Sequence, residues 1–357
     1  MKDVSGASAV SKRFRQIAIT SIALALGITG CSDKPAESRV GQTAQVAPSQ
    51  SAAVSAARAA IRVTGDVSFG GQYETGGVAW DPSSHLVYVA NPQSNTVSVV
   101  DPKTKSVTRK INVDNHPTEV AVDSTSQTLL VTQVSGSSPD TRSLPGTLSF
   151  IDLKSGSVTA TVDVGTGPSG LAVDSGTAYV GRAQSTSVVA IDLNSHTTRN
   201  LAITPGGRCG GIAVDTTTHL IYAVDGNNSQ VTIADPSGTI VGTVPIGSMP
   251  RGLGVDAGNK TAYAPSTQGS ITVIDTAAKS VKATIDTGSS PGTIGIDTSS
   301  HIVYSTDKDG KVFAIDPATN TVLASFDVGQ FPATPVVDPE THTVFIAASG
   351  VLSFIEP

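Results

Sequence analysis

GVAWDPSSHLVYVANPQSNTVSVVDPKTKSVTRKINV (77–113) contains four short runs rich in β-branched residues, separated by Pro, Asn, Asp and Ser. The first run recurs along the chain and always ends in Asp, as GVAWD (77–81), EVAVD (119–123), GLAVD (170–174), GIAVD (211–215), GLGVD (252–256), TIGID (293–297) and TPVVD (334–338). These Asp residues lie 42, 51, 41, 41, 41 and 41 positions apart. A period near forty with four strands per unit is typical of a β-propeller. We therefore predict an all-β, seven-bladed β-propeller with four-stranded blades.

The composition of each run predicts its place in the blade. The first run is almost wholly apolar, as expected of a strand buried on both faces near the propeller axis. The fourth run, such as SVTATVDV (157–164), alternates polar and apolar residues, as expected of an exposed outer edge. The repeated Asp residues open turns, and we expect their carboxylates to accept backbone N–H groups there.

The two ends of the repeat region are predicted to meet in one blade. The last unit ends with its third run, VLSFIE (351–356), and has no fourth. IRVTGDVSFGG (61–71) resembles the fourth run VTATVDVGTG (158–167) and has no unit before it. Pairing these segments removes an open sheet edge. We therefore predict that this N-terminal strand completes the seventh blade.

The residues before the repeats indicate export. Three basic residues, an apolar stretch and a cysteine follow one another: Lys12, Arg13, Arg15, IAITSIALALGITG (17–30) and Cys31. This order matches a bacterial lipoprotein signal, with Cys31 as the lipidated residue. We predict a signal peptide (1–30), a flexible tether starting at lipidated Cys31 (31–58) and the propeller (59–357). The predicted location is the bacterial cell envelope, with the lipid as the only membrane anchor and the outer membrane as the default. The alternative is an ordinary cleaved signal peptide with an incidental cysteine.

Charge and cysteine content narrow the partners. Without residues 1–30 the chain has 19 Lys+Arg and 28 Asp+Glu, a net charge of −9. This balance argues against a broad nucleic-acid-binding surface. Once Cys31 is lipidated, Cys209 is the only thiol left, and no Cys-rich metal motif or haem attachment motif occurs. We predict no metal, no cofactor and a monomer.

VYVANPQSNTVSVVD (87–101) resembles the YVTN-type β-propeller repeat, and the resemblance extends over about 61–357. It implies a secreted or surface-exposed bacterial propeller, usually without an assigned reaction. Related seven-bladed propellers include lactonases, streptogramin-type lyases and electron-transfer subunits. The chain departs from the repeat in two places, a longer connection at QVSGSSPDTRSLPG (133–146) and AVD (223–225) where the repeat often has VTN.

The repeat also sorts polar residues by face. Connections between second and third strands share one face, here called the top face, with the connections between successive blades. Four histidines occupy one equivalent turn on the opposite, bottom face: His85, His219, His301 and His342. Because they belong to different blades, we expect a structural role in the turn and not a shared metal site. Five tyrosines share one second-strand position and are expected to pack between blades: Tyr88, Tyr179, Tyr222, Tyr263 and Tyr304.

Residues that depart from their repeat position are the candidate site residues. The predicted ligand-binding residues all belong to the top face: Arg182, Arg208, Arg251, Tyr73, Glu74, Asp225, Asp307 and Phe331. Three of these, Arg182, Arg208 and Arg251, are interpreted either as one patch for a carboxylate or phosphate, or as independently solvated arginines. Cys209 is interpreted as a small buried substitute for proline, the alternative being a thiol with a lowered pKa beside Arg208.

His116 and Glu119 are the weak catalytic candidates, as a general acid–base pair or part of a metal site. We find no P-loop, GxSxG, HExxH or Ser/His/Asp pattern. We therefore favour a non-enzymatic module that binds an envelope protein or a small anionic ligand through the top face. The first alternative is a lactonase-like or lyase-type enzyme acting on a small anionic substrate. The second, without a haem or quinone-type motif behind it, is a scaffold subunit of an envelope redox complex.

Overall fold

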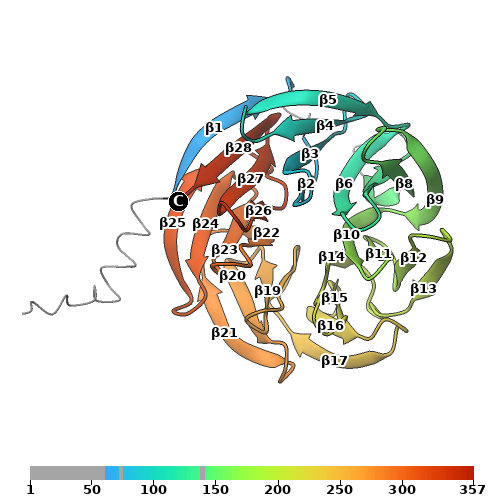
Figure 1. Ribbon diagram of the computed structural model, residues 1–357. Coiled ribbons are helices and arrows are strands. Elements are labelled where there is room, and N and C mark those ends of the chain that lie inside the picture. Colours follow the sequence, from blue (N-terminus) through green and yellow to red (C-terminus); the bar gives the residue numbers. More distant parts are fainter. Residues whose placement is uncertain (1–60, 72–74, 137–140) are drawn as a thin grey trace, which may run out of the picture. The chain divides into compact units, whose positions relative to one another are not determined.

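Short antiparallel strands make up nearly all of the regular structure. The computed structural model describes residues 61–71, 75–136 and 141–357, and in these ranges it contains 28 strands and one 3-10 turn, η1 (Thr141–Ser143). The strands form seven four-stranded sheets arranged in a ring (Figure 1). This architecture confirms the predicted all-β, seven-bladed propeller. No helix in the described ranges is long and apolar enough to cross a membrane.

Six blades take their strands in chain order, from the axis outward. Blade 1 has β2 (Val78–Asp81), β3 (Leu86–Asn91), β4 (Thr96–Asp101) and β5 (Ser106–Asn112); blade 2 has β6 (His116–Asp123), β7 (Thr128–Val134), β8 (Pro145–Asp152) and β9 (Val158–Thr166); blade 3 has β10 (Pro168–Asp174), β11 (Thr177–Arg182), β12 (Val188–Asp192) and β13 (Thr198–Leu201). Blade 4 has β14 (Cys209–Val214), β15 (Ile221–Asp225), β16 (Gln230–Ala234) and β17 (Ile240–Pro245); blade 5 has β18 (Gly254–Asp256), β19 (Thr261–Ser266), β20 (Ser270–Asp275) and β21 (Ser280–Asp286); blade 6 has β22 (Pro291–Ile296), β23 (Val303–Asp307), β24 (Lys311–Asp316) and β25 (Thr321–Asp327).

Blade 7 joins the two ends of the propeller. It contains β26 (Val336–Asp338), β27 (Thr343–Ala348), β28 (Val351–Glu356) and, as its outer strand, β1 (Arg62–Ser68). β1 runs antiparallel to β28, with Arg62 opposite Glu356 and Ser68 opposite Val351. Blue β1 lies beside red β28 in Figure 1. The predicted closure of the seventh blade by the N-terminal strand is therefore confirmed.

The core is divided among the junctions between blades. The described residues form seven buried apolar clusters, and each draws its residues from two neighbouring blades. The repeated second-strand position contributes one residue to each cluster: Tyr88, Leu130, Tyr179, Tyr222, Tyr263, Tyr304 and Phe345. The tyrosines are thus packing residues, as predicted. This burial of large side chains between blades is the main apolar contribution to stability.

The bottom turns add polar links between blades. His219 Nδ1 lies 2.8 Å from Asp174 Oδ2, His301 Nδ1 lies 2.7 Å from Asp256 Oδ2, and His342 Nδ1 lies 2.6 Å from Asp297 Oδ2. In each pair the aspartate is the last residue of the innermost strand of one blade or, for Asp297, the residue after it, and the histidine belongs to the next blade. These histidines have φ near +60°, a conformation that the tight turn requires. The structure thus supports a structural role for these three histidines, and the fourth, His85, has the same turn conformation (φ 54°) but no aspartate contact among the described residues.

Candidate functional site

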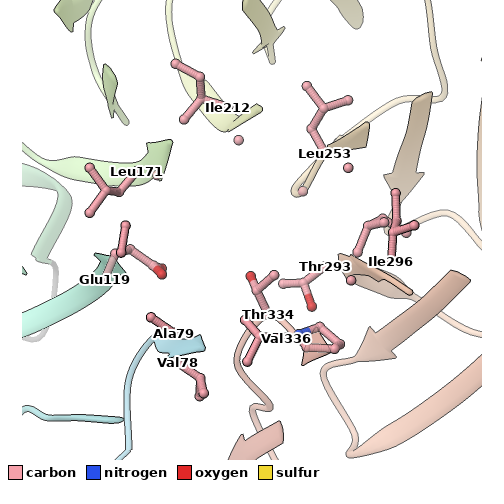
Figure 2. A pocket seen from close by; sticks show the side chains of 18 of the residues that line it. Val78, Ala79, Glu119, Leu171, Ile212, Leu253, Thr293, Ile296, Thr334 and Val336 are labelled. Atoms are coloured by element: carbon pink, nitrogen blue, oxygen red, sulfur yellow. The ribbon is translucent and has the colours of Figure 1, made fainter. Parts of the chain in front are cut away.

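A cavity of about 530 Å³ runs along the propeller axis and is lined by the innermost strands (Figure 2). One repeat position, here called the collar position, lies either within the first four residues of an innermost strand or one or two residues before it. In chain order it holds Gly77, Glu119, Gly170, Gly211, Gly252, Thr293 and Thr334, and all of these except Gly77 line the cavity. The small residues leave the cavity open at this level. Glu119 is the one charged member of the collar.

Glu119 is held in place by its backbone. Its N–H donates to Thr132 Oγ1 at 2.9 Å, and the β6–β7 register shifts between Pro117 and Val120, which turns this residue toward the axis. Figure 2 shows the carboxylate directed into the cavity. A Cβ atom at neighbouring Gly77 would lie only 2.6 Å from Glu119 Oε2. The glycine in blade 1 therefore makes the space that the carboxylate of blade 2 occupies.

The Glu119 carboxylate has no hydrogen bond or ion pair within the described ranges. Part of the residue borders the cavity, yet the surrounding protein removes most of its water. This burial raises the pKa of Glu119 from 4.5 to about 7. Its carboxyl group therefore changes charge near neutral pH.

The two sides of the cavity differ in chemistry at this level. Going round the ring from Glu119, blades 3 to 5 present the aliphatic side chains of Leu171, Ile212 and Leu253, and blades 6 and 7 present Thr293 and Thr334 (Figure 2). The Thr293 hydroxyl is engaged with Thr306 Oγ1 at 2.5 Å. The Thr334 hydroxyl has no hydrogen bond to any described residue. The cavity thus combines an unpartnered carboxylate and hydroxyl with an apolar wall.

The structure separates the two catalytic candidates. His116 and Glu119 both belong to β6, but only Glu119 lines the axial cavity. His116 begins the strand and is only partly buried. The two side chains are therefore not gathered around one cavity of the described residues. In those residues there is also no group of three metal-ligating side chains.

The three arginines occupy three different environments. Arg182 donates to Ser187 Oγ and, at 3.1 Å, to Asn200 Oδ1, so its guanidinium is engaged within blade 3. Arg208 lines a second cavity, and Arg251 is exposed at the axial cavity. The three arginines therefore do not line one common cavity of the described residues.

The second cavity has a volume of about 530 Å³ and lies on the top face between blades 3 and 4. Arg208 lines it together with Arg142, which lies in η1, and with the backbone of Gly206 and Gly207. Sequence reasoning pointed to the long connection 133–146 but not to Arg142 itself. This connection has no counterpart in the other units. Arg142 therefore has no equivalent residue elsewhere in the chain with which it could be compared.

Asp225 and Asp307 brace connections on the top face. Asp225 Oδ2 accepts the Gly206 N–H at 3.0 Å and the Asn228 side-chain amide at 2.8 Å. Asp307 Oδ1 accepts the N–H groups of Asp309 and Lys311, both at 2.9 Å. Both aspartates are buried at the ends of second strands. These contacts assign them a structural role and leave their predicted ligand contact unsupported. The other predicted residues Tyr73, Glu74 and Cys31 lie outside the described residues.

Phe331 and Met249 have the most exposed large apolar side chains of the described residues, at 65% and 50%. Both occupy one repeat position three residues before the collar, here called the rim position. Residues at this position in four blades have positive φ: Gly167 (65°), Arg208 (63°), Met249 (54°) and Phe331 (54°). The left-handed backbone thus recurs in four of the six described rim residues, whereas the exposed apolar side chains belong to single blades. Phe331 is one of the ligand-binding residues predicted from the sequence, whereas Met249 is not.

Cys209 has no features of a reactive thiol. It is buried at the start of β14, and burial raises its pKa from 9.0 to about 11. A thiol with such a pKa is protonated at neutral pH. The interpretation of Cys209 as a small buried residue is therefore supported, and the proposed lowered pKa is wrong.

Comparison with known proteins identifies the fold but no family. No family model matches the sequence, and no curated protein matches it. Among solved structures, a chain of the mitotic checkpoint complex is 15% identical, with a TM-score of 0.69, and the match covers 90% of this chain and 99% of that chain. A chain of Kuenenia stuttgartiensis hydrazine synthase is also 15% identical, with a TM-score of 0.69, and the match covers 83% and 99%. At this identity the likeness concerns the propeller fold alone.

Proposed function

We propose that this chain is a lipid-anchored interaction module of the bacterial cell envelope that binds a protein partner through the top face of its propeller. The observation that carries the proposal is the exposure of Phe331 and Met249 at the rim position. Exposed large apolar side chains are typical anchors of protein interfaces.

The backbone at the rim strengthens this interpretation. A residue with a Cβ atom in the left-handed region costs about 1 kcal/mol relative to glycine. Blade 3 has Gly167 at this position, whereas blades 5 and 7 have Met249 and Phe331. Neither side chain is buried in the propeller, so burial on folding does not offset the backbone strain at these positions. Contact with a partner would supply the missing burial.

Charge indicates the chemistry of the partner. Arg251 is exposed two residues after Met249, and Arg208 lies at the rim position of the neighbouring blade 4. The predicted mature chain carries a net charge of −9, so these two arginines make this part of the surface locally positive on an acidic protein. A partner segment with apolar side chains beside acidic ones fits this surface, because complementary charge guides association.

The anchor and the family remain part of the proposal. The lipobox-like order ending in Cys31 and the polar segment to residue 58 favour a propeller tethered to a membrane. The resemblance to YVTN-type repeats favours a secreted or surface-exposed location. The matching chain of the mitotic checkpoint complex belongs, by that description, to an assembly, which fits an interaction role. No observation favours the enzymatic alternative, since His116 and Glu119 do not share a cavity.

Site-specific photocrosslinking tests the proposed function. A benzoylphenylalanine residue is placed at position 331 or 249, and as a control at Val281 on the outer strand β21, which is 45% exposed. In envelope preparations, positions 331 and 249 are expected to give the same defined protein adduct and position 281 none. An excess of purified wild-type propeller should suppress the adduct, and the Phe331→Ser/Met249→Ser double variant should not. Equal adducts at position 281, or none at the rim, would overturn the proposal.

A further inference from the structure

We propose that the axial cavity is a binding site for a primary alkylammonium group, with the Glu119 carboxylate as its anionic contact. The proposal is independent of the top-face partner, because it concerns the interior of the ring and a small ligand. Three observations carry it: the space made for the carboxylate, the distribution of acceptors around it, and its lack of a partner.

The space for the carboxylate is built by two blades. Glu119 projects from blade 2, and Gly77 of blade 1 leaves the gap in which Oε2 lies. At the collar position the other blades carry only glycine or threonine. A cavity of this form keeps one charged group accessible in a wall that is otherwise neutral at the same level.

The acceptors match an ammonium group. A –NH₃⁺ group has three hydrogen-bond donors and no acceptor. The two Glu119 oxygens and the free Thr334 hydroxyl face the same part of the cavity (Figure 2). Leu171 beside Glu119, and Ile212 and Leu253 farther round the ring, offer an aliphatic surface for an alkyl chain. The cavity is therefore complementary to a cation on a hydrocarbon chain.

An incoming cation also compensates the desolvated carboxylate. Glu119 is raised in pKa by burial alone, with no contribution from another charged residue. An ammonium ion beside it favours the ionised form, so binding releases a proton at and below neutral pH. The lining segments β2, β10, β14, β22 and β26 contribute no ionisable side chain, and the single other ionisable lining residue is Arg251 before β18. Arg251 is exposed to solvent, which screens its repulsion.

Other ligands fit the cavity less well. A divalent metal ion needs several ligand oxygens from acidic or carbonyl groups, and Glu119 is the one acidic side chain lining this cavity. An anion would be repelled by the Glu119 carboxylate, and exposed Arg251 is the single cationic side chain lining this cavity that could attract it. A neutral alkyl chain would contact the apolar wall but would supply no hydrogen-bond donor to the Glu119 carboxylate.

The protein contains its own probe for this site. Trp80 is the single tryptophan of the chain and lines the axial cavity, so its fluorescence reports occupancy. The purified propeller is titrated with hexylammonium, hexanol and hexanoate at pH 8, with calorimetry as a second measurement. Hexylammonium is expected to bind at least about tenfold more tightly than either analogue. Between pH 8 and pH 6 its affinity is expected to fall about tenfold, as Glu119 becomes protonated.

Variants decide which side chain holds the cation. Glu119→Gln keeps the shape and is expected to weaken hexylammonium binding by about tenfold or more. The matched control Glu340→Gln makes the same substitution at an exposed glutamate outside the cavity and is expected to bind hexylammonium as tightly as the wild type. Equal affinity for hexylammonium and hexanol, preference for hexanoate, or unchanged binding by Glu119→Gln would each overturn the proposal. A folded Glu119→Gln variant is verified by its unchanged far-UV spectrum, so loss of binding is not confused with unfolding.

Discussion

Two carboxylates at opposite ends of the innermost strands differ in almost every respect. Asp297, at the bottom of blade 6, is 1% exposed and accepts hydrogen bonds from the Ser300 hydroxyl and His342. Glu119, at the collar of blade 2, has no donor among the described residues. Burial alone would raise the pKa of Asp297, but its hydrogen bonds outweigh burial and the pKa lies below 3.8. The pKa of Glu119 is instead raised to about 7. The repeated carboxylate thus stabilises the fold, whereas the unrepeated one is left available for a ligand.

Removing the bottom carboxylate should have the largest effect on stability. Asp297→Ala leaves buried donors without an acceptor and is expected to lower the free energy of unfolding by about 2 to 4 kcal/mol. Chemical denaturation at pH 7 measures the difference. The control is Asp316→Ala, which removes a partly exposed turn aspartate that accepts from Ala318 N–H at 2.8 Å, and which should cost about 1 kcal/mol. Equal losses in both variants would contradict the special role of the Asp297 link.

The pH dependence of the same variant has a defined sign. Because the pKa of folded Asp297 lies below its ordinary value of 3.8, the ionised carboxylate stabilises the fold above that pH. This contribution is lost as the pH falls through the lower, folded-state pKa. The stability difference between wild type and Asp297→Ala should therefore narrow below about pH 4. A constant difference down to pH 2 would show that ionisation of Asp297 is irrelevant.

Removing the collar charge should have the opposite effect. The pKa of Glu119 rises from 4.5 to about 7 on folding, so the folded state loses stability as the pH increases through this window. Glu119→Gln is therefore expected to be more stable than the wild type at pH 8, by about 1 to 2 kcal/mol, and equal to it near pH 4. Thermal unfolding at both pH values measures this, with exposed Glu340→Gln as a control that should change neither. A destabilised Glu119→Gln at pH 8 would mean that the carboxylate has a stabilising partner.

How much the sequence predicts follows the same division. The number of blades, the packing tyrosines and the N-terminal strand of blade 7 were predictable because the same sequence pattern recurs in each unit. Comparing the units shows which residue type each position requires. Glu119 was chosen as a candidate because it differs from the residues at the same repeat position in the other units. Its relation to Gly77 was not predictable, because that contact joins two blades across 42 residues and depends on how closely their backbones approach.

Single polar residues were harder to interpret from sequence. Arg182 and Asp225 also differ from the residues at their repeat position in most other units. Yet Arg182 donates a hydrogen bond to Ser187, and Asp225 accepts one from the Gly206 N–H. A departure therefore marks either a ligand contact or a local exchange of hydrogen-bond partners. Only the three-dimensional neighbours distinguish the two cases, because the connecting turns that supply those partners differ from blade to blade.

The smallest expected effect compares left-handed residues at the two ends. Phe331 (φ 54°) and His342 (φ 60°) are under similar backbone strain, which glycine relieves. Phe331→Gly is expected to raise the free energy of unfolding by about 0.5 to 1 kcal/mol, because its exposed ring contributes little to folding. His342→Gly gains the same relief but loses the 2.6 Å contact to Asp297, so we expect no gain or a loss of about 0.5 kcal/mol. Urea denaturation of the two variants compares them directly. If Phe331→Gly were the less stable variant, Phe331 would have a structural role and the rim would not be a surface maintained for a partner.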